Sequence, residues 1–189
     1  MMDANTIKIM TSSDRQDYGT PRELFEAVER LFIKASGRRF ELDACAHADN
    51  TKCDRYFNAK ENGLIQDFGA LNTWMNPPFK YAAEWVKKAY EESTRGARVA
   101  VCIPARMDAN WFINYAWKAA ELRFLTRRVK FTGATDQAPF PVVILVYDRD
   151  LPAKSFCGPW DYEKETERLT QPDFFAEDGP IATASEVIG

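Results

Sequence analysis

The sequence contains no long apolar run, only four cysteines and no excess of basic residues. No stretch of about 18 apolar residues occurs, so we expect no membrane-spanning helix. The polar start of the chain lacks the apolar segment of a secretory signal, and we therefore expect a cytoplasmic protein. Without an export signal, Cys45, Cys53, Cys102 and Cys157 are expected to be reduced thiols, several of them buried.

The chain also has a single histidine, His47, which narrows the chemistry that it can perform. A catalytic Ser-His-Asp or Cys-His system would have to use this one residue, and no motif places a partner beside it. Cys45, His47 and Cys53 lack a fourth ligand and the paired spacing of a zinc site, so we predict no metal.

The charge balance is slightly acidic, with a formal net charge of −3 and an isoelectric point of about 5.4. Such a chain has no global basic field to attract nucleic acid. If the protein binds DNA, the basic groups must be local.

What the chain does have is the size and apolar content of one folded domain. It has 189 residues, of which 46% are hydrophobic and 13% aromatic. We expect a flexible arm over residues 1–16, a domain over 17–150 and a partly ordered tail over 151–189. Trp160, Tyr162, Phe174 and Phe175 in that tail are apolar enough to dock on the domain.

The pattern alternates helices with strands. Thr20, Pro21 and Glu23 form a capping box that predicts a helix ending near Gly37. A second helix is expected over 81–93, with Glu84 and Lys88 on its solvent side, and a third is expected to be capped by Asp108. Strands are predicted at 40–46, 73–75, 97–104, 122–125, 129–131 and 142–147, with a weaker one at 56–57.

The last three strands follow one another without helices between them. The order of elements therefore predicts a three-layer α/β domain, mostly parallel with an antiparallel C-terminal strand pair.

The motif with the clearest chemistry is the tetrapeptide Asn76-Pro77-Pro78-Phe79, which follows a predicted strand. An exocyclic amino group on an aromatic ring is a poor nucleophile, because its lone pair is delocalised. Two acceptors, the Asn76 side-chain oxygen and the Pro77 carbonyl, can draw that nitrogen toward a tetrahedral geometry. The prolines stiffen the loop, and Phe79 offers a face on which an extracted base can stack. A simple strand-ending turn is the alternative reading of these residues alone.

Five further segments accompany the tetrapeptide in a fixed order. They are Asp17-Tyr18-Gly19-Thr20-Pro21, Leu42-Asp43-Ala44-Cys45-Ala46, Gly63-Leu64-Ile65-Gln66-Asp67, Ile103-Pro104-Ala105-Arg106 and Arg128-Val129-Lys130-Phe131. Over residues 17–147 this ordered set resembles the phage-type Dam-like DNA N6-adenine methyltransferase family. The resemblance implies a Rossmann-like methyltransferase fold, S-adenosylmethionine as methyl donor, double-stranded DNA as substrate and a bacterial host cell as location.

The resemblance also assigns site residues. It implies a catalytic role for Asn76, Pro77, Pro78 and Phe79. It implies that the cofactor is bound by Tyr18, Thr20, Pro21, Asp43, Ala44, Cys45 and Asp67. One departure stands out, because residues 43–49 contain no glycine where many methyltransferases have a glycine-rich turn after the first strand.

DNA contacts are expected from a local group of basic and aromatic residues. The candidates are Arg106, Arg127, Arg128, Lys130 and Phe131. Because Asn-Pro-Pro-aromatic loops also serve RNA guanine and protein glutamine methyltransferases, the tetrapeptide alone leaves those substrates open. A DNA-binding relative that has lost its chemistry is the third alternative.

Overall fold

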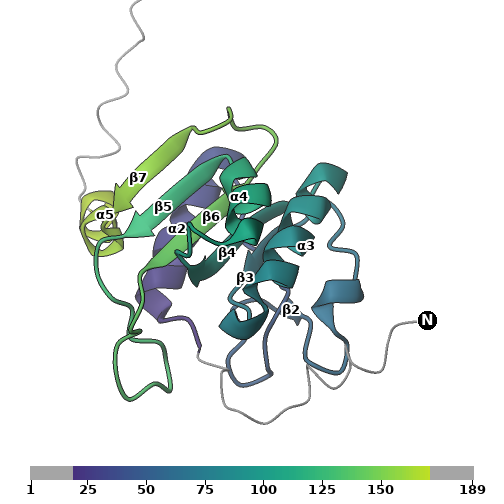
Figure 1. Ribbon diagram of the computed structural model, residues 1–189, viewed down its shortest axis with the longest axis horizontal. Helices are drawn as coiled ribbons and strands as arrows, with labels where there is room; N and C mark the ends of the chain where they lie inside the picture. The colour runs from purple at the N-terminus through teal and green to yellow at the C-terminus, as the bar shows by residue number, and fades with distance from the viewer. Residues whose placement is uncertain (1–18, 171–189) are drawn as a thin grey trace, which may run out of the picture.

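The computed structural model describes residues 19–170, which form one seven-stranded sheet covered by helices (Figure 1). The strand order is β2-β1-β3-β4-β6-β5-β7. The strands are β1 (Leu42–Asp43), β2 (Arg55–Tyr56), β3 (Asn72–Met75), β4 (Arg98–Pro104), β5 (Glu121–Leu125), β6 (Val142–Tyr147) and β7 (Phe156–Trp160).

The helices of this part of the chain are short to medium in length. They are α2 (Arg22–Ser36), α3 (Ala82–Arg95), α4 (Asn110–Asn114), α5 (Tyr162–Thr170) and the 3-10 turns η1 (Gly63–Ile65), η2 (Phe79–Tyr81) and η3 (Ala116–Lys118). Within residues 19–170, no helix has the length and apolar character needed to span a bilayer.

The sheet is parallel in one half and mixed in the other. β2, β1, β3 and β4 run parallel, whereas β6 pairs antiparallel with both β4 and β5. The predicted three-layer α/β fold with an antiparallel C-terminal pair is thereby confirmed. The edge strand β7 adds a parallel pairing to β5.

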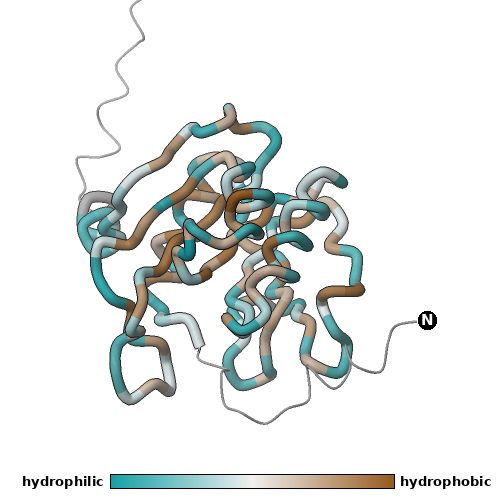
Figure 2. Tube along the Cα trace, in the orientation of Figure 1, coloured by the Kyte–Doolittle hydropathy of each residue, from teal (hydrophilic) through white to brown (hydrophobic). Residues whose placement is uncertain are grey.

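Two apolar layers hold the sheet between its helices, because neighbouring residues of β4 face opposite sides. Val99, Val101 and Ile103 pack in the layer under α3 and α4. Ala100 and Cys102 pack in the layer under α2, together with Trp74 of β3. In Figure 2 the hydrophobic colour gathers along the central strands, and the hydrophilic colour lies on outer turns.

The first helix begins one residue later than its capping box predicts. Pro21 is the N-cap residue, and no side chain caps this end of α2. The predicted Thr20 cap is wrong, because the preceding Gly19 is bridged to Thr132 and holds the chain in an extended path. The Thr20 side chain is buried instead. The predicted end is confirmed, with Gly37 in the left-handed conformation at φ 69°.

Helix α3 differs from its prediction at Lys88, which is buried and not on the solvent side. Its ammonium group donates to Glu92 Oε1 at 2.7 Å and to the Gln66 carbonyl at 2.6 Å. Glu92 is fully buried, and it also accepts from Arg95 and from the Phe68 amide. The ion pair compensates the two buried charges, so the aliphatic stem of Lys88 can lie in the core.

Three other predicted elements are shorter or absent. The strand expected at 40–46 is reduced to Leu42–Asp43. The helix expected after Asp108 is capped by Ala109 and splits into α4 and η3. Residues 129–131 form no strand. They belong to the loop that joins β5 to β6, and their apolar side chains, Val129 and Phe131, are buried.

The sheet and its helices continue beyond residue 150. β7 pairs with β5 along five residues, and α5 packs against α2. Trp160 at the end of β7 is buried, and Tyr162 packs beside it. Phe174 and Phe175 lie outside the described residues, and the domain boundary at 150 stays a prediction.

We predict that Glu92→Gln lowers the free energy of unfolding by about 3 kcal/mol, because it leaves the buried Lys88 ammonium without its carboxylate. Glu91→Gln is the matched control on the same helix. Its pair with Lys87 is exposed at 52% and 43%, so its loss is expected to cost less than about 1 kcal/mol. Chemical denaturation measures both, and equal losses would contradict a stabilising role for the buried pair.

Candidate functional site

The candidate site lies where the direction of the chain reverses across the sheet. From β1 the chain passes to β2 on one side, and β3 then pairs with β1 on the other side. The loops that follow β1 and β3 therefore diverge, and at such a reversal a ligand crevice is expected at the carboxyl ends of the parallel strands. Asp43 is the last residue of β1, and Asn76 directly follows β3.

The pairing of β1 with β3 sets these two residues side by side. Asp43 is opposite Trp74, and the amide of Ala44 donates to the Trp74 carbonyl at 3.0 Å. Asn76 follows Trp74 by two residues and lies directly after the end of β3. The structure therefore brings the predicted catalytic loop next to the predicted cofactor turn.

The Asn76–Phe79 segment is held rigidly. Pro77 is buried, and so is the Oδ1 atom of Asn76. The amide of Tyr81 donates to the Pro78 carbonyl at 2.9 Å as η2 begins. The Pro78 carbonyl is thus already hydrogen-bonded in this turn. The Pro77 carbonyl is therefore the proline carbonyl that suits the predicted role of accepting a hydrogen from an amino group, beside the Asn76 oxygen.

Phe79 is surrounded by aromatic side chains from the loop between β5 and β6. Its ring meets Phe131 at 5.4 Å between centroids and Phe140 at 5.5 Å, with interplanar angles of 70° and 77°. Both contacts are edge-to-face, an arrangement favoured by the ring quadrupoles. The structure thus brings the predicted residues Phe79 and Phe131 together. It adds Phe140, which no sequence motif marks.

The segment before α2 closes the same end of the sheet. Gly19 and Thr132 exchange two backbone hydrogen bonds, of 3.1 and 2.8 Å. A Cβ on Gly19 would lie 3.3 Å from Cβ of Thr132 and 3.8 Å from Cβ of Asn50. The buried Thr20 and the partly buried Pro21 therefore follow a point where the loops after β1 and β5 meet. Tyr18 lies outside the described residues.

Asp43 is a buried carboxylate that organises the loop after β1. Its oxygens accept from the amide of Lys52 at 3.0 Å and from the amide of Cys45 at 3.4 Å. Burial raises the pKa of Asp43 to about 6, although the two amides favour its charged form. At neutral pH the group is mostly ionised, so a buried negative charge lies at the end of β1.

The glycine missing after β1 is supplied by a different segment. Gly63 begins η1, and a Cβ built on it would lie only 2.2 Å from the Ala44 carbonyl oxygen and 3.0 Å from Cη2 of Trp85. Only a residue without a side chain permits this close approach of two backbones. The backbone of Gly63 therefore packs directly against the turn at Ala44. Gly63 belongs to the segment 63–67 of the sequence motifs, but its packing role could not be seen from the sequence.

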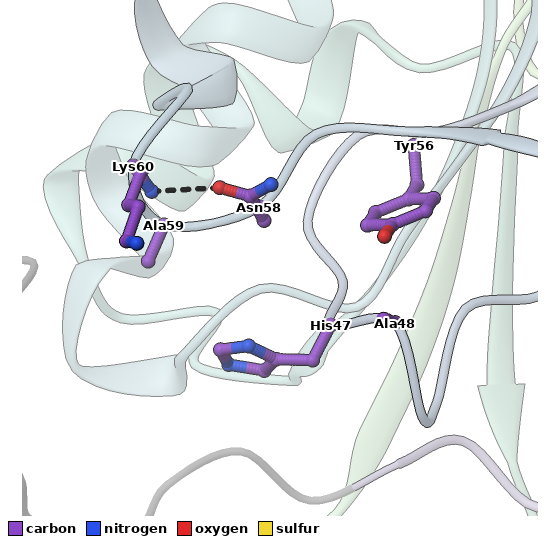
Figure 3. A pocket seen from close by; sticks show the side chains of 6 residues that line it. All are labelled: His47, Ala48, Tyr56, Asn58, Ala59 and Lys60. Carbon is purple, nitrogen blue, oxygen red and sulfur yellow. Dashed lines mark hydrogen bonds between the residues drawn. The ribbon is translucent and has the colours of Figure 1, made fainter.

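A shallow pocket of about 320 Å³ lies beside the ends of β1 and β2 (Figure 3). It is lined by His47, Ala48, Tyr56, Asn58, Ala59 and Lys60. The rings of His47 and Tyr56 border it from two sides, and the amide of Lys60 donates to Asn58 Oδ1 at 2.9 Å. Tyr56 and Asn58 were not predicted from the sequence, since neither belongs to a motif with known chemistry.

Two predicted residues lie elsewhere or are already engaged. Asp67 is exposed in the loop that leads into the amino end of β3, where its Oδ1 accepts from the Gly69 amide at 2.7 Å. Its role as a cofactor ligand stays a prediction. Arg127 pairs with Glu163 at 2.5 Å and with Asp161 at 3.7 Å at the start of α5.

The other predicted cations are exposed near the carboxyl edge of the sheet. Arg106 follows the end of β4, while Arg128 and Lys130 lie in the loop that carries Phe131. Within residues 19–170, none of the three forms an ion pair. They are therefore available to a polyanion, whereas Arg127 would first have to give up its carboxylates.

The fold and the crevice define a class: a Rossmann-like methyltransferase domain, with the Asn-Pro-Pro-Phe loop at the end of the strand next to β1. The model of the family described as DNA N-6-adenine-methyltransferase (Dam) matches residues 8–153. The chain belongs to this family of DNA N6-adenine methyltransferases, as its motifs predicted.

Two curated relatives carry the same name. The DNA N-6-adenine-methyltransferase of Haemophilus phage HP1 is 28% identical over 159 residues, covering 80% of this chain and 87% of the relative. The DNA N-6-adenine-methyltransferase of Escherichia phage T1 is 29% identical over 109 residues, covering 57% of this chain. That match spans 44% of the T1 protein.

We predict that Gly63→Ala lowers the free energy of unfolding by about 1–3 kcal/mol, because the new methyl group collides with the Ala44 carbonyl. Gly158→Ala is the matched control, since its Cβ would meet only Cζ of Phe156 at 3.9 Å. Thermal or chemical denaturation compares the two variants. A Gly63→Ala protein as stable as Gly158→Ala would show that the close approach is not a constraint.

We also predict a pH dependence from Asp43. Its folded pKa of about 6 lies above the ordinary value of 3.8, so its contribution to stability is greatest below pH 3.8 and is lost as pH rises through 6. Relative to Asp43→Asn, which does not titrate, the wild type should lose up to about 3 kcal/mol of unfolding free energy over this window. Denaturation at several pH values measures the difference, and a pH-independent difference would contradict the raised pKa.

Proposed function

We propose that the chain transfers a methyl group from S-adenosylmethionine to the N6 amino group of an adenine that has been rotated out of double-stranded DNA. The observation that supports this most directly is the place of Asn76–Phe79 at the carboxyl end of β3, beside the buried Asp43 at the end of β1. Membership of the family supports adenine in DNA as the target.

The residues of the tetrapeptide would activate and hold the base. The Oδ1 atom of Asn76 and the carbonyl of Pro77 would accept the two hydrogens of the adenine amino group, which localises the nitrogen lone pair. Phe79 would support the flat face of the base, and its own position is fixed by Phe131 and Phe140. After transfer, the excess proton on nitrogen would leave to water.

The donor fits the crevice by charge and shape. When bound, S-adenosylmethionine supplies an electrophilic methyl group and carries positive charge on its sulfonium and ammonium groups. Asp43 offers a carboxylate, and Thr20 with Pro21 would border the methionine end. The pocket between His47 and Tyr56 would take the nucleoside half, because it opens at the ends of β1 and β2.

The DNA would be held by the cations that remain outside ion pairs with the described residues. Arg106, Arg128 and Lys130 are exposed near the crevice and would neutralise phosphates around the extracted base. Arg127, engaged with Asp161 and Glu163, would contribute less.

A crossed pair of variants tests this assignment. Asn76→Ala should bind S-adenosylmethionine with near wild-type affinity and lose about a hundredfold or more of its methyl-transfer rate on duplex DNA. Tyr56→Ala should instead weaken donor binding by about tenfold, because a ring that borders the nucleoside is lost. Calorimetry measures the binding, and transfer of a radiolabelled methyl group measures the rate.

Tyr56→Phe is the control, since it keeps the ring, and it should bind the donor nearly as the wild type does. Full activity of Asn76→Ala would overturn the role of the tetrapeptide, and unchanged binding by Tyr56→Ala would overturn the donor pocket. Label that enters only RNA or protein would refute the DNA substrate. A wild-type chain that binds no donor would be a non-catalytic relative.

A further inference from the structure

The loop between β5 and β6 is much longer than its connection requires. β5 and β6 are antiparallel neighbours, which hairpins commonly join with two to five residues. Here 16 residues, 126–141, separate Leu125 from Val142. In Figure 1 this green loop extends beyond the body of the sheet at the lower left. Such an insertion next to a candidate site points to a function beyond chain connection.

The base of this loop is fixed to the core and to the site. Val129, Phe131 and Ala138 are buried, and the amide of Ala138 donates to the Val129 carbonyl at 2.8 Å. Phe131 and Phe140 both contact Phe79. The loop is therefore preorganised, and its outer residues are held in a defined position relative to the proposed base pocket.

The outer part of the loop has polar side chains that are not used by the fold. Thr135, Asp136 and Gln137 are exposed, and their side chains form no hydrogen bond or ion pair within residues 19–170. Gly133, at φ 88°, turns the chain just before them. The hydroxyl of Thr135, the carboxylate of Asp136 and the amide of Gln137 therefore provide hydrogen-bond donors and acceptors that the fold does not use.

The distribution of charge along the loop suggests what these side chains meet. Arg128 and Lys130 lie near its base and suit phosphates. Asp136 lies at its tip, where a carboxylate would be repelled by phosphates but can accept a hydrogen bond from the amino group of cytosine. Gln137 is a side chain of the kind that pairs with adenine, and Thr135 can contact either donors or acceptors. The base of the loop thus suits the DNA backbone, and the tip suits base edges.

We propose that residues 135–137 at the tip of this loop read the bases beside the target adenine and determine the sequence that is methylated. The proposal rests on the proposed function of the site. In it, Arg128 and Lys130 position the loop on the duplex, while Thr135, Asp136 and Gln137 discriminate between sequences in the groove. The aromatic contacts with Phe79 link the reading tip to the base pocket at a fixed distance.

The test compares the methylation preferences of full-length variants on a randomised double-stranded DNA library. The Thr135→Ala/Asp136→Ala/Gln137→Ala variant should still methylate adenine, with discrimination at one or more flanking positions reduced about tenfold. Arg128→Ala/Lys130→Ala should weaken binding to all sequences alike and retain the wild-type preference. Glu84→Ala, an exposed substitution on α3, is the control and should change neither property.

A triple variant with the wild-type flanking preference would overturn the inference and leave adenine methylation intact. If that variant methylates nothing, the ratio of its affinities for the wild type's preferred duplex and a scrambled duplex decides. A reduced ratio supports the inference, and an unchanged ratio overturns it. A wild-type chain that methylates no DNA would overturn the proposed function, and this inference with it.

Discussion

The short pairing between β1 and β3 is the constraint on which the rest of the site depends. β1 has only two residues, yet its register against β3 places the end of one strand beside the start of the Asn-Pro-Pro-Phe loop. The sheet then continues from β3 through β4 and β6, so the crevice is supported by the most deeply buried strands of the protein. Shifting this register by one residue would turn Asp43 to the other face of the sheet.

Much of the fold could be predicted from local patterns. The apolar run 97–104 and the cluster 142–147 became β4 and β6 because a buried strand needs a continuous apolar sequence. The wrong local predictions share a cause, because in each case tertiary contacts determined the structure. Thr20 does not cap α2 because Gly19 is bound to Thr132, and residues 129–131 are no strand because Val129 and Phe131 anchor a loop. Lys88 is buried because Glu92 lies one turn away.

The candidate site was predictable where its chemistry lies in one contiguous motif. Asn76–Phe79 and the turn at Asp43 are such motifs, and the structure places them together. Phe140, Tyr56 and the supporting role of Gly63 were not predictable, because each acts through a neighbour that is distant in the sequence. The cofactor contact that the motif of Asp67 suggested stays a prediction, and its carboxylate accepts from the Gly69 amide in a local turn.

The cations of the loop after β5 also make the molecule electrically asymmetric. The chain has a net charge of −3, while Arg127 is neutralised by the start of α5 and Arg128 and Lys130 are not. Because this net charge is small, a polyanion at long range is neither strongly attracted nor strongly repelled, and within a screening length of about 8–10 Å Arg128 and Lys130 attract it locally. Arg128 and Lys130 therefore favour orientations in which a charged polymer approaches this loop, and the low net charge keeps the attraction local rather than spread over the whole surface.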